Sequence, residues 1–154
     1  MLAALAACSK QSDPPTTPSS DTPLVEQLAA DPPAAPVEEF RGAFAPGGIA
    51  ADYRAIFSSN QIKSIAETRQ VGASATVQSG EYEFHGARLI KYQGAALGSA
   101  QDIELQFDVQ GKVLVARAGE NTVSAEEISA IRDRAQSLRS HAVAQYAVRG
   151  HDQH

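Results

Sequence analysis

Proline and the aromatic residues lie on opposite sides of a boundary near residue 40. Seven of the eight prolines precede it, whereas all nine aromatic residues and all eleven glycines lie at Phe40 or beyond. A segment rich in Pro, Ser, Thr and Asp that lacks aromatic side chains cannot bury enough apolar surface to offset its ordering entropy. We therefore expect residues 8–39 to form a disordered tether, residues 40–149 a single folded domain, and residues 150–154 a flexible tail.

The charge of the chain divides at the same boundary. Up to residue 39 there is one basic residue against six acidic ones, and the remainder carries twelve of each, so the net charge of −5 belongs to the tether. A neutral domain without a cluster of Lys and Arg argues against nucleic acid as a partner. With one cysteine in the chain no intramolecular disulfide is possible, and the domain must be held by its own core.

The first residues carry the one family resemblance that the sequence offers. Leu5-Ala6-Ala7-Cys8 resembles the lipobox of bacterial lipoproteins, which has an aliphatic residue and two small residues before a cysteine. The resemblance implies that Cys8 carries a diacylglyceryl thioether and an acylated amino terminus, an anchor that several acyl chains make effectively permanent. Ser9 at the following position implies an outer-membrane address, with the domain facing the periplasm.

The match departs from the family pattern at its start. Signal peptides have a basic first region and an apolar stretch of about 7–15 residues, whereas only six apolar residues follow Met1 here and no basic residue precedes them. Residues 1–7 are accordingly expected to be a truncated signal peptide. No apolar run approaches the length of a transmembrane helix.

The domain is predicted to begin with helical periodicity and to continue with strands. Apolar residues at Ile49, Tyr53, Ile56 and Phe57 predict a short amphipathic helix, and residues 62–69 a further helical turn or two. Alternation then predicts a hairpin turning at Ser79-Gly80, with Val77 opposite Tyr82 and Ala75 opposite Phe84. The stretch His85–Tyr92 continues as a strand with a bulge or corner at Gly86, and either Leu89 or Ile90 faces the core.

A second hairpin and a long helix complete the predicted fold. A type I turn from Asp108 to Gly111 pairs Phe107 with Val113 and Leu105 with Val115. Ser124 and Glu127 form a capping box at the start of a helix. Its apolar stripe recurs at three- and four-residue spacing through Ile128, Ile131, Ala135, Leu138, Ala142 and Tyr146. The predicted class is α+β: an antiparallel meander of about four to five strands, with the short first helix and the long last helix packed on one face.

Sites for catalysis, metals and cofactors are not expected. The sequence has no nucleophile elbow and no phosphate-binding loop. The histidines in residues 151–154 lie in a polar tail, His85 is more typical of a strand corner, and His141 is expected to be half-exposed. Glu81 and Glu83 share a solvent face, where carboxylates are ordinary. Arg132, Arg134 and Arg139 are expected to form a solvated helix face.

One stretch is singled out for binding, and three functions compete. Tyr82, Arg88, Lys91 and Tyr92 are candidate interface anchors, although the two tyrosines fit the core better. The favoured hypothesis is a non-enzymatic protein-binding module of the cell envelope, held on the outer membrane. The second is an inhibitor or immunity protein against a toxin or lysozyme that attacks the cell wall, and the third, least favoured, is an envelope enzyme.

Overall fold

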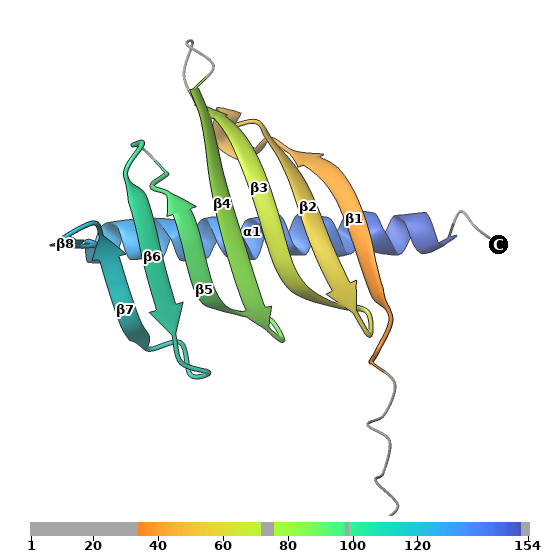
Figure 1. Cartoon of the computed structure of the whole chain (residues 1–154). Coiled ribbons are helices and arrows are strands. Elements are labelled where there is room, and N and C mark those ends of the chain that lie inside the picture. Colours follow the sequence, from red (N-terminus) through yellow and green to blue (C-terminus); the bar gives the residue numbers. More distant parts are fainter. Residues whose placement is uncertain (1–33, 72–75, 98, 152–154) are drawn as a thin grey trace, which may run out of the picture. The chain divides into compact units, whose positions relative to one another are not determined.

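In the computed structural model a single antiparallel sheet is covered on one face by one helix (Figure 1). The structure describes residues 34–71, 76–97 and 99–151. Eight strands follow one another in chain order across the sheet, so the topology is a simple meander. The elements are β1 (Val37–Phe44), η1 (Pro46–Gly48), β2 (Ala51–Ser58), β3 (Gln61–Val71), β4 (Thr76–His85), β5 (Arg88–Ala95), β6 (Asp102–Phe107), β7 (Val113–Ala118), β8 (Asn121–Thr122) and α1 (Ala125–His151).

The predicted class, the antiparallel meander and the long last helix on one face are confirmed. The predicted number of strands is wrong, because the sheet has eight. The predicted first helix and the segment after it are both strands, and β1 and β8 are two more strands that were not predicted. β1 also begins three residues before the predicted boundary of the domain, and α1 continues two residues into the predicted tail.

The predicted helix over residues 49–57 is wrong because two alanines hide the period of a strand. In β2 every second residue from Ala51 to Phe57 is buried, so Ala51 and Ala55 face the core together with Tyr53. A search for large apolar side chains passes over both alanines and instead selects Ile56, which is only half-buried. Residues 62–69 also belong to a strand, β3. Its alternation is hidden for a different reason, because charged residues occupy two of its core positions.

The predicted turn at Ser79-Gly80 is wrong, because β4 runs straight through it. Gly80 lies opposite Gly94, and a Cβ atom added to Gly80 would come within 2.9 Å of the Tyr92 ring. The glycine therefore makes room for an aromatic ring. Tyr82 consequently faces Tyr92 and not Val77, and the turn to β5 comes later, at Gly86, whose φ is +61°. Of the two alternatives for β5, Leu89 is the residue that packs on the core.

The β6–β7 hairpin follows the prediction at its turn and departs from it one pair further on. Gly111 donates its N–H to the Asp108 carbonyl at 2.9 Å, and Phe107 lies opposite Val113 as expected. The expected pairing of Leu105 with Val115 is wrong, because a β-bulge between these pairs places Leu105 opposite Ala116. Leu114, next to the bulge, is left exposed.

Helix α1 has the cap and the apolar stripe expected of it. The Glu127 N–H donates to the Ser124 hydroxyl at 3.2 Å, which is one half of the capping box. The middle of the predicted stripe is buried, and its two ends, Ile128 and Tyr146, are half-buried against the core. With 27 residues α1 is about 40 Å long. Eight strands at about 4.8 Å spacing span about 34 Å, so the helix is slightly longer than the sheet is wide. No helix in the described part of the chain is long and apolar enough to cross a membrane.

Candidate functional site: the open edge of the sheet

The structure brings two of the four residues predicted for binding together, Tyr82 and Tyr92, but it does not unite the four in one exposed site. Tyr82 and Tyr92 are 0% exposed and lie in the core, so neither can contact a partner, and the alternative assignment to the core describes both. Arg88 is exposed at the start of β5 and donates to the Val109 carbonyl. Lys91 is half-buried and pairs with Glu83 at 3.3 Å. The prediction that Tyr82 and Tyr92 anchor an interface is therefore wrong.

The two tyrosines belong instead to a buried network centred on Glu67. Its Oε1 accepts hydrogen bonds from the Tyr82 hydroxyl at 2.5 Å and from Arg69 Nη1 at 2.9 Å. Its Oε2 accepts from Arg134 Nη2 at 2.9 Å. Arg69 Nη2 donates to the Ala95 carbonyl at 2.7 Å and to the Tyr92 hydroxyl at 3.3 Å. The network thus joins α1 to β3, β4 and β5 on the face of the sheet that α1 covers.

This network is not predicted from the sequence, because the spacing of the arginines in α1 indicates a solvated helix face. Arg134 directly precedes a buried residue of the stripe, and its side chain is 7% exposed. Arg132 is half-buried, with its guanidinium 4.4 Å from the centre of the Phe107 ring, and Arg139 is half-buried as well. Burial first, and then the charge of Glu67, raise the pKa of Tyr82 far above its ordinary value. Because Glu67 and Arg69 are sealed from solvent, the network is a structural element of the core.

The two edges of the sheet differ sharply. On one side β7 is short, contains the bulge at its pairing with β6, and is partly covered by β8. On the other side β1 pairs with β2 over eight residues without a register shift, and no described strand pairs with its outer edge. Proteins commonly protect edge strands by shortening, bulging or covering them. The β7–β8 edge has these features. The outer side of β1 has no described strand beside it, and we call it the open edge.

Hydrogen bonding shows which residues of β1 face outward. The Ala50 carbonyl accepts from the Gln70 N–H at 3.1 Å, so the backbone groups of Ala50 point to β3. Backbone groups alternate in direction along a strand, and the odd-numbered residues of β2 therefore bond β1. By the register, their partners on β1 are the even-numbered residues. The Ala43 carbonyl agrees with this assignment, because it accepts from His141 Nε2 of α1 at 3.0 Å. The outward N–H and C=O groups not covered in this way belong to Val37, Glu39 and Arg41.

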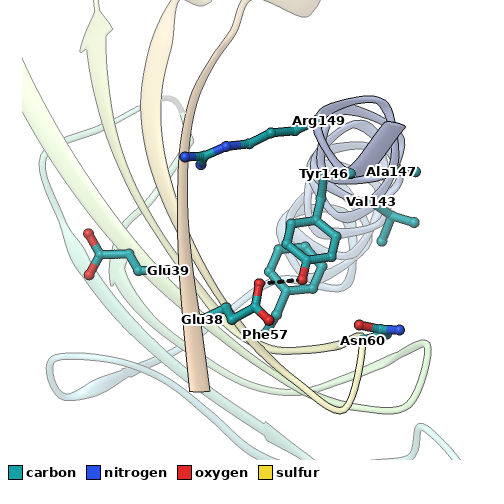
Figure 2. A pocket seen from close by; sticks show the side chains of 9 residues that line it. Glu38, Glu39, Phe57, Asn60, Val143, Tyr146, Ala147 and Arg149 are labelled. Carbon is teal, nitrogen blue, oxygen red and sulfur yellow. Dashed lines mark hydrogen bonds between the residues drawn. The ribbon is translucent and has the colours of Figure 1, made fainter. Parts of the chain in front are cut away.

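A pocket of about 630 Å³ lies beside this open stretch, between β1 and the last turns of α1 (Figure 2). Its floor is the ring of Phe57, on which Tyr146 stacks with ring centres 4.0 Å apart and planes 14° apart. The Tyr146 hydroxyl donates to Glu38 at 2.6 Å. Figure 2 shows Glu38 and Tyr146 on the helix side of β1 and Glu39 on the opposite side. Asn60, at the β2–β3 turn, and Val143 complete the wall.

Arg149 closes the upper side of the pocket next to Phe40. Its guanidinium carbon lies 6.0 Å from the centre of the Phe40 ring. Figure 2 shows the side chain extending from α1 as far as β1. The site thus offers a carboxylate, an aromatic floor, a guanidinium and a row of backbone groups, and these can hold an extended peptide. The described residues contain no group of three or more His, Cys, Asp or Glu suited to a metal ion.

Cys8 and residues 152–154 lie outside the described residues. His85 is exposed at the end of β4, and His141 is half-buried between the rings of Phe44 and Tyr53. No family model matches this chain, and no curated protein and no solved structure matches it significantly.

Proposed function

We propose that this protein is an outer-membrane lipoprotein, attached through Cys8, whose domain binds a partner protein by adding an extended segment of that partner to β1. The observation that carries the proposal is the contrast between the sheet's edges: one is bulged and covered, whereas at the other β1 pairs regularly over eight residues and no described strand lies on its outer side. Strand addition uses such an edge, with main-chain hydrogen bonds for affinity and neighbouring pockets for specificity. The Glu38–Tyr146 pocket lies where such specificity would be needed.

The anchor and the tether support the same function. The lipobox resemblance at Leu5–Cys8 implies an acylated cysteine before a Pro- and Ser-rich segment, and the described chain enters β1 three residues after Ala34. The proposal requires a segment that holds the domain at the membrane and lets it reach a partner, and a Pro- and Ser-rich composition is suited to that task. A Cys8→Ser variant with a complete signal peptide should lose palmitate labelling and leave the membrane fraction. If it still sediments with outer membranes, the proposed anchor is wrong.

The edge is tested by site-specific photo-crosslinking in cells. Val37 at the open edge and Val77 on β4 are matched valines, 68% and 63% exposed. A photoreactive residue at position 37 should give a discrete adduct with a partner protein, and the same residue at position 77 should not. Glu39→Pro removes an outward N–H without affecting a bond to β2, so it should abolish the adduct while circular dichroism stays unchanged. Glu39→Gln is the control for charge. Equal adducts at both valines, or none at position 37, would reject strand addition.

A further inference from the structure

The open edge has room for one strand, and a second copy of this chain does not fit. After Tyr146, α1 continues for five residues to His151, which is about 7.5 Å and covers one strand at about 4.8 Å spacing. Figure 1 shows this end of α1 projecting beyond β1. Antiparallel pairing of two β1 strands requires a two-fold axis perpendicular to the sheet, which puts both helices on the same face. The last turns of the two helices would then compete for the same space.

The register of β1 determines which side chains of an added strand enter the site. Side chains opposite Glu39 and Arg41 face solvent, because these residues lie on the uncovered face of the sheet. Side chains opposite Phe40 and Glu38 face α1. Phe40 is 9% exposed and contacts Tyr146 edge-on, with ring centres 6.1 Å apart, so an apolar side chain beside it would extend the core.

The position opposite Glu38 favours a cation. Glu38 is exposed and paired to the Tyr146 hydroxyl, and a hydroxyl leaves the negative charge of the carboxylate in place. The last carbonyls of α1 add a partial negative charge at this end of the helix. The Arg149 guanidinium lies near the Phe40 ring. In Figure 2 it extends to β1 and is directed away from the Glu38 carboxylate. Opposite charges facing each other across a strand pair stabilise it, and like charges destabilise it.

We infer, building on the proposed function, that the β1 edge selects an extended antiparallel segment with an apolar residue opposite Phe40 and, two residues later, a Lys or Arg opposite Glu38. The partner is therefore a protein with an exposed basic strand or an unstructured basic segment without proline at these positions. It adds one strand to the sheet and fills the space beneath the end of α1.

Two labelled peptides test this specificity on the full chain. They are acetylated and amidated pentapeptides, Thr-Leu-Thr-Lys-Thr and Thr-Leu-Thr-Glu-Thr, titrated by fluorescence anisotropy at low ionic strength. The lysine peptide should bind about tenfold more tightly than the glutamate peptide. Glu38→Lys should reverse the order, and the matched change Glu83→Lys on the uncovered face should leave it unchanged. Glu39→Pro should abolish binding of both peptides. Circular dichroism checks that each variant is folded.

The other outcomes overturn the inference in distinguishable ways. Equal binding of both peptides, together with a crosslink at Val37, would reject the charge preference and leave strand addition standing. Absence of both peptide binding and the crosslink would reject the proposed function as well. A dimer in sedimentation that Glu39→Pro dissociates would make a second copy the occupant. Peptide binding only after removal of residues 1–33 would make the chain's own N-terminal segment the occupant.

Discussion

The same three kinds of side chain join α1 to the sheet at two places, one in the middle of the sheet and one at its edge. In the middle, the Tyr82 hydroxyl donates to Glu67 at 2.5 Å and Arg134 of α1 pairs with that carboxylate. At the edge, the Tyr146 hydroxyl donates to Glu38 at 2.6 Å, and Arg149 of α1 lies over the neighbouring Phe40 ring.

The two groups differ in what surrounds them. Glu67 has strands on both sides and α1 above it, and its side chain is 0% exposed. Glu38 lies on the edge strand β1 and is exposed, because no described strand lies on the outer side of β1. Both oxygens of the enclosed Glu67 carboxylate accept hydrogen bonds, because an unpaired buried charge is costly. Position in the sheet, more than residue type, thus decides whether a Glu–Tyr–Arg group is enclosed in the core or left exposed to solvent.

The largest expected effect comes from making the same substitution at both carboxylates. Glu67→Gln leaves the guanidinium groups of Arg69 and Arg134 buried without a counter-charge, which should cost about 3–5 kcal/mol of unfolding free energy. Glu38→Gln should leave stability nearly unchanged, since solvent screens that carboxylate. Urea melts followed by circular dichroism measure both variants. Equal losses of unfolding free energy at Glu67 and Glu38 would show that enclosure in the sheet does not set the two carboxylates apart.

A smaller effect is expected from the arginines of α1. Arg134→Met removes two donors from Glu67 but leaves Arg69 paired with it, so the remaining pair is neutral and the loss should be about 2 kcal/mol. Arg149→Met, the same change at the open end, should melt with the parent. Arg134→Met must therefore lie between Glu67→Gln and the parent in the same melts. If it is as damaging as Glu67→Gln, charge balance in the core is not what matters.

The features predicted correctly from the sequence are those encoded within a few residues. The turn at Asp108–Gly111 depends on an Asp side chain whose Oδ1 accepts from the N–H groups of Gln110 and Lys112, at 2.9 and 2.8 Å. The start of α1 depends on one hydroxyl, that of Ser124. The stripe of α1 follows directly from its periodicity. Such signals need no knowledge of distant parts of the chain.

The features that were missed depend on distant residues. Glu67 and Arg69 occupy core positions of β3 because they pair with each other and Glu67 also pairs with Arg134, 67 residues away. The alternation of polarity therefore fails there. Gly80 resembles a turn residue until the Tyr92 ring that lies over it is known. The open edge could not be predicted, because the edge strand of a sheet is known only when all the strand pairings are known. Glu38 and Tyr146, 108 residues apart, share no local pattern.

The smallest expected effect is a difference between the tyrosines as pH rises. The pKa of Tyr82 is raised by burial and then by Glu67, and that of Tyr146 is raised by its hydrogen bond to Glu38. A phenol whose folded-state pKa is raised contributes stability that is fully present below its ordinary pKa of about 10 and is lost as pH rises above it. Because Tyr82 is buried, it should ionise only as the protein unfolds, whereas Tyr146 should ionise in the folded state.

Tyrosinate absorbance and circular dichroism, recorded together against pH, separate these events. Tyr146→Phe should remove an early ionisation that precedes loss of structure and leave the cooperative alkaline transition in place, because that transition depends on the enclosed tyrosines. If Tyr146→Phe instead shifts the cooperative transition, the edge group contributes to the core as the buried one does. In that case the exposed carboxylate of Glu38 is not free to meet a basic strand, and the contrast between the two groups disappears.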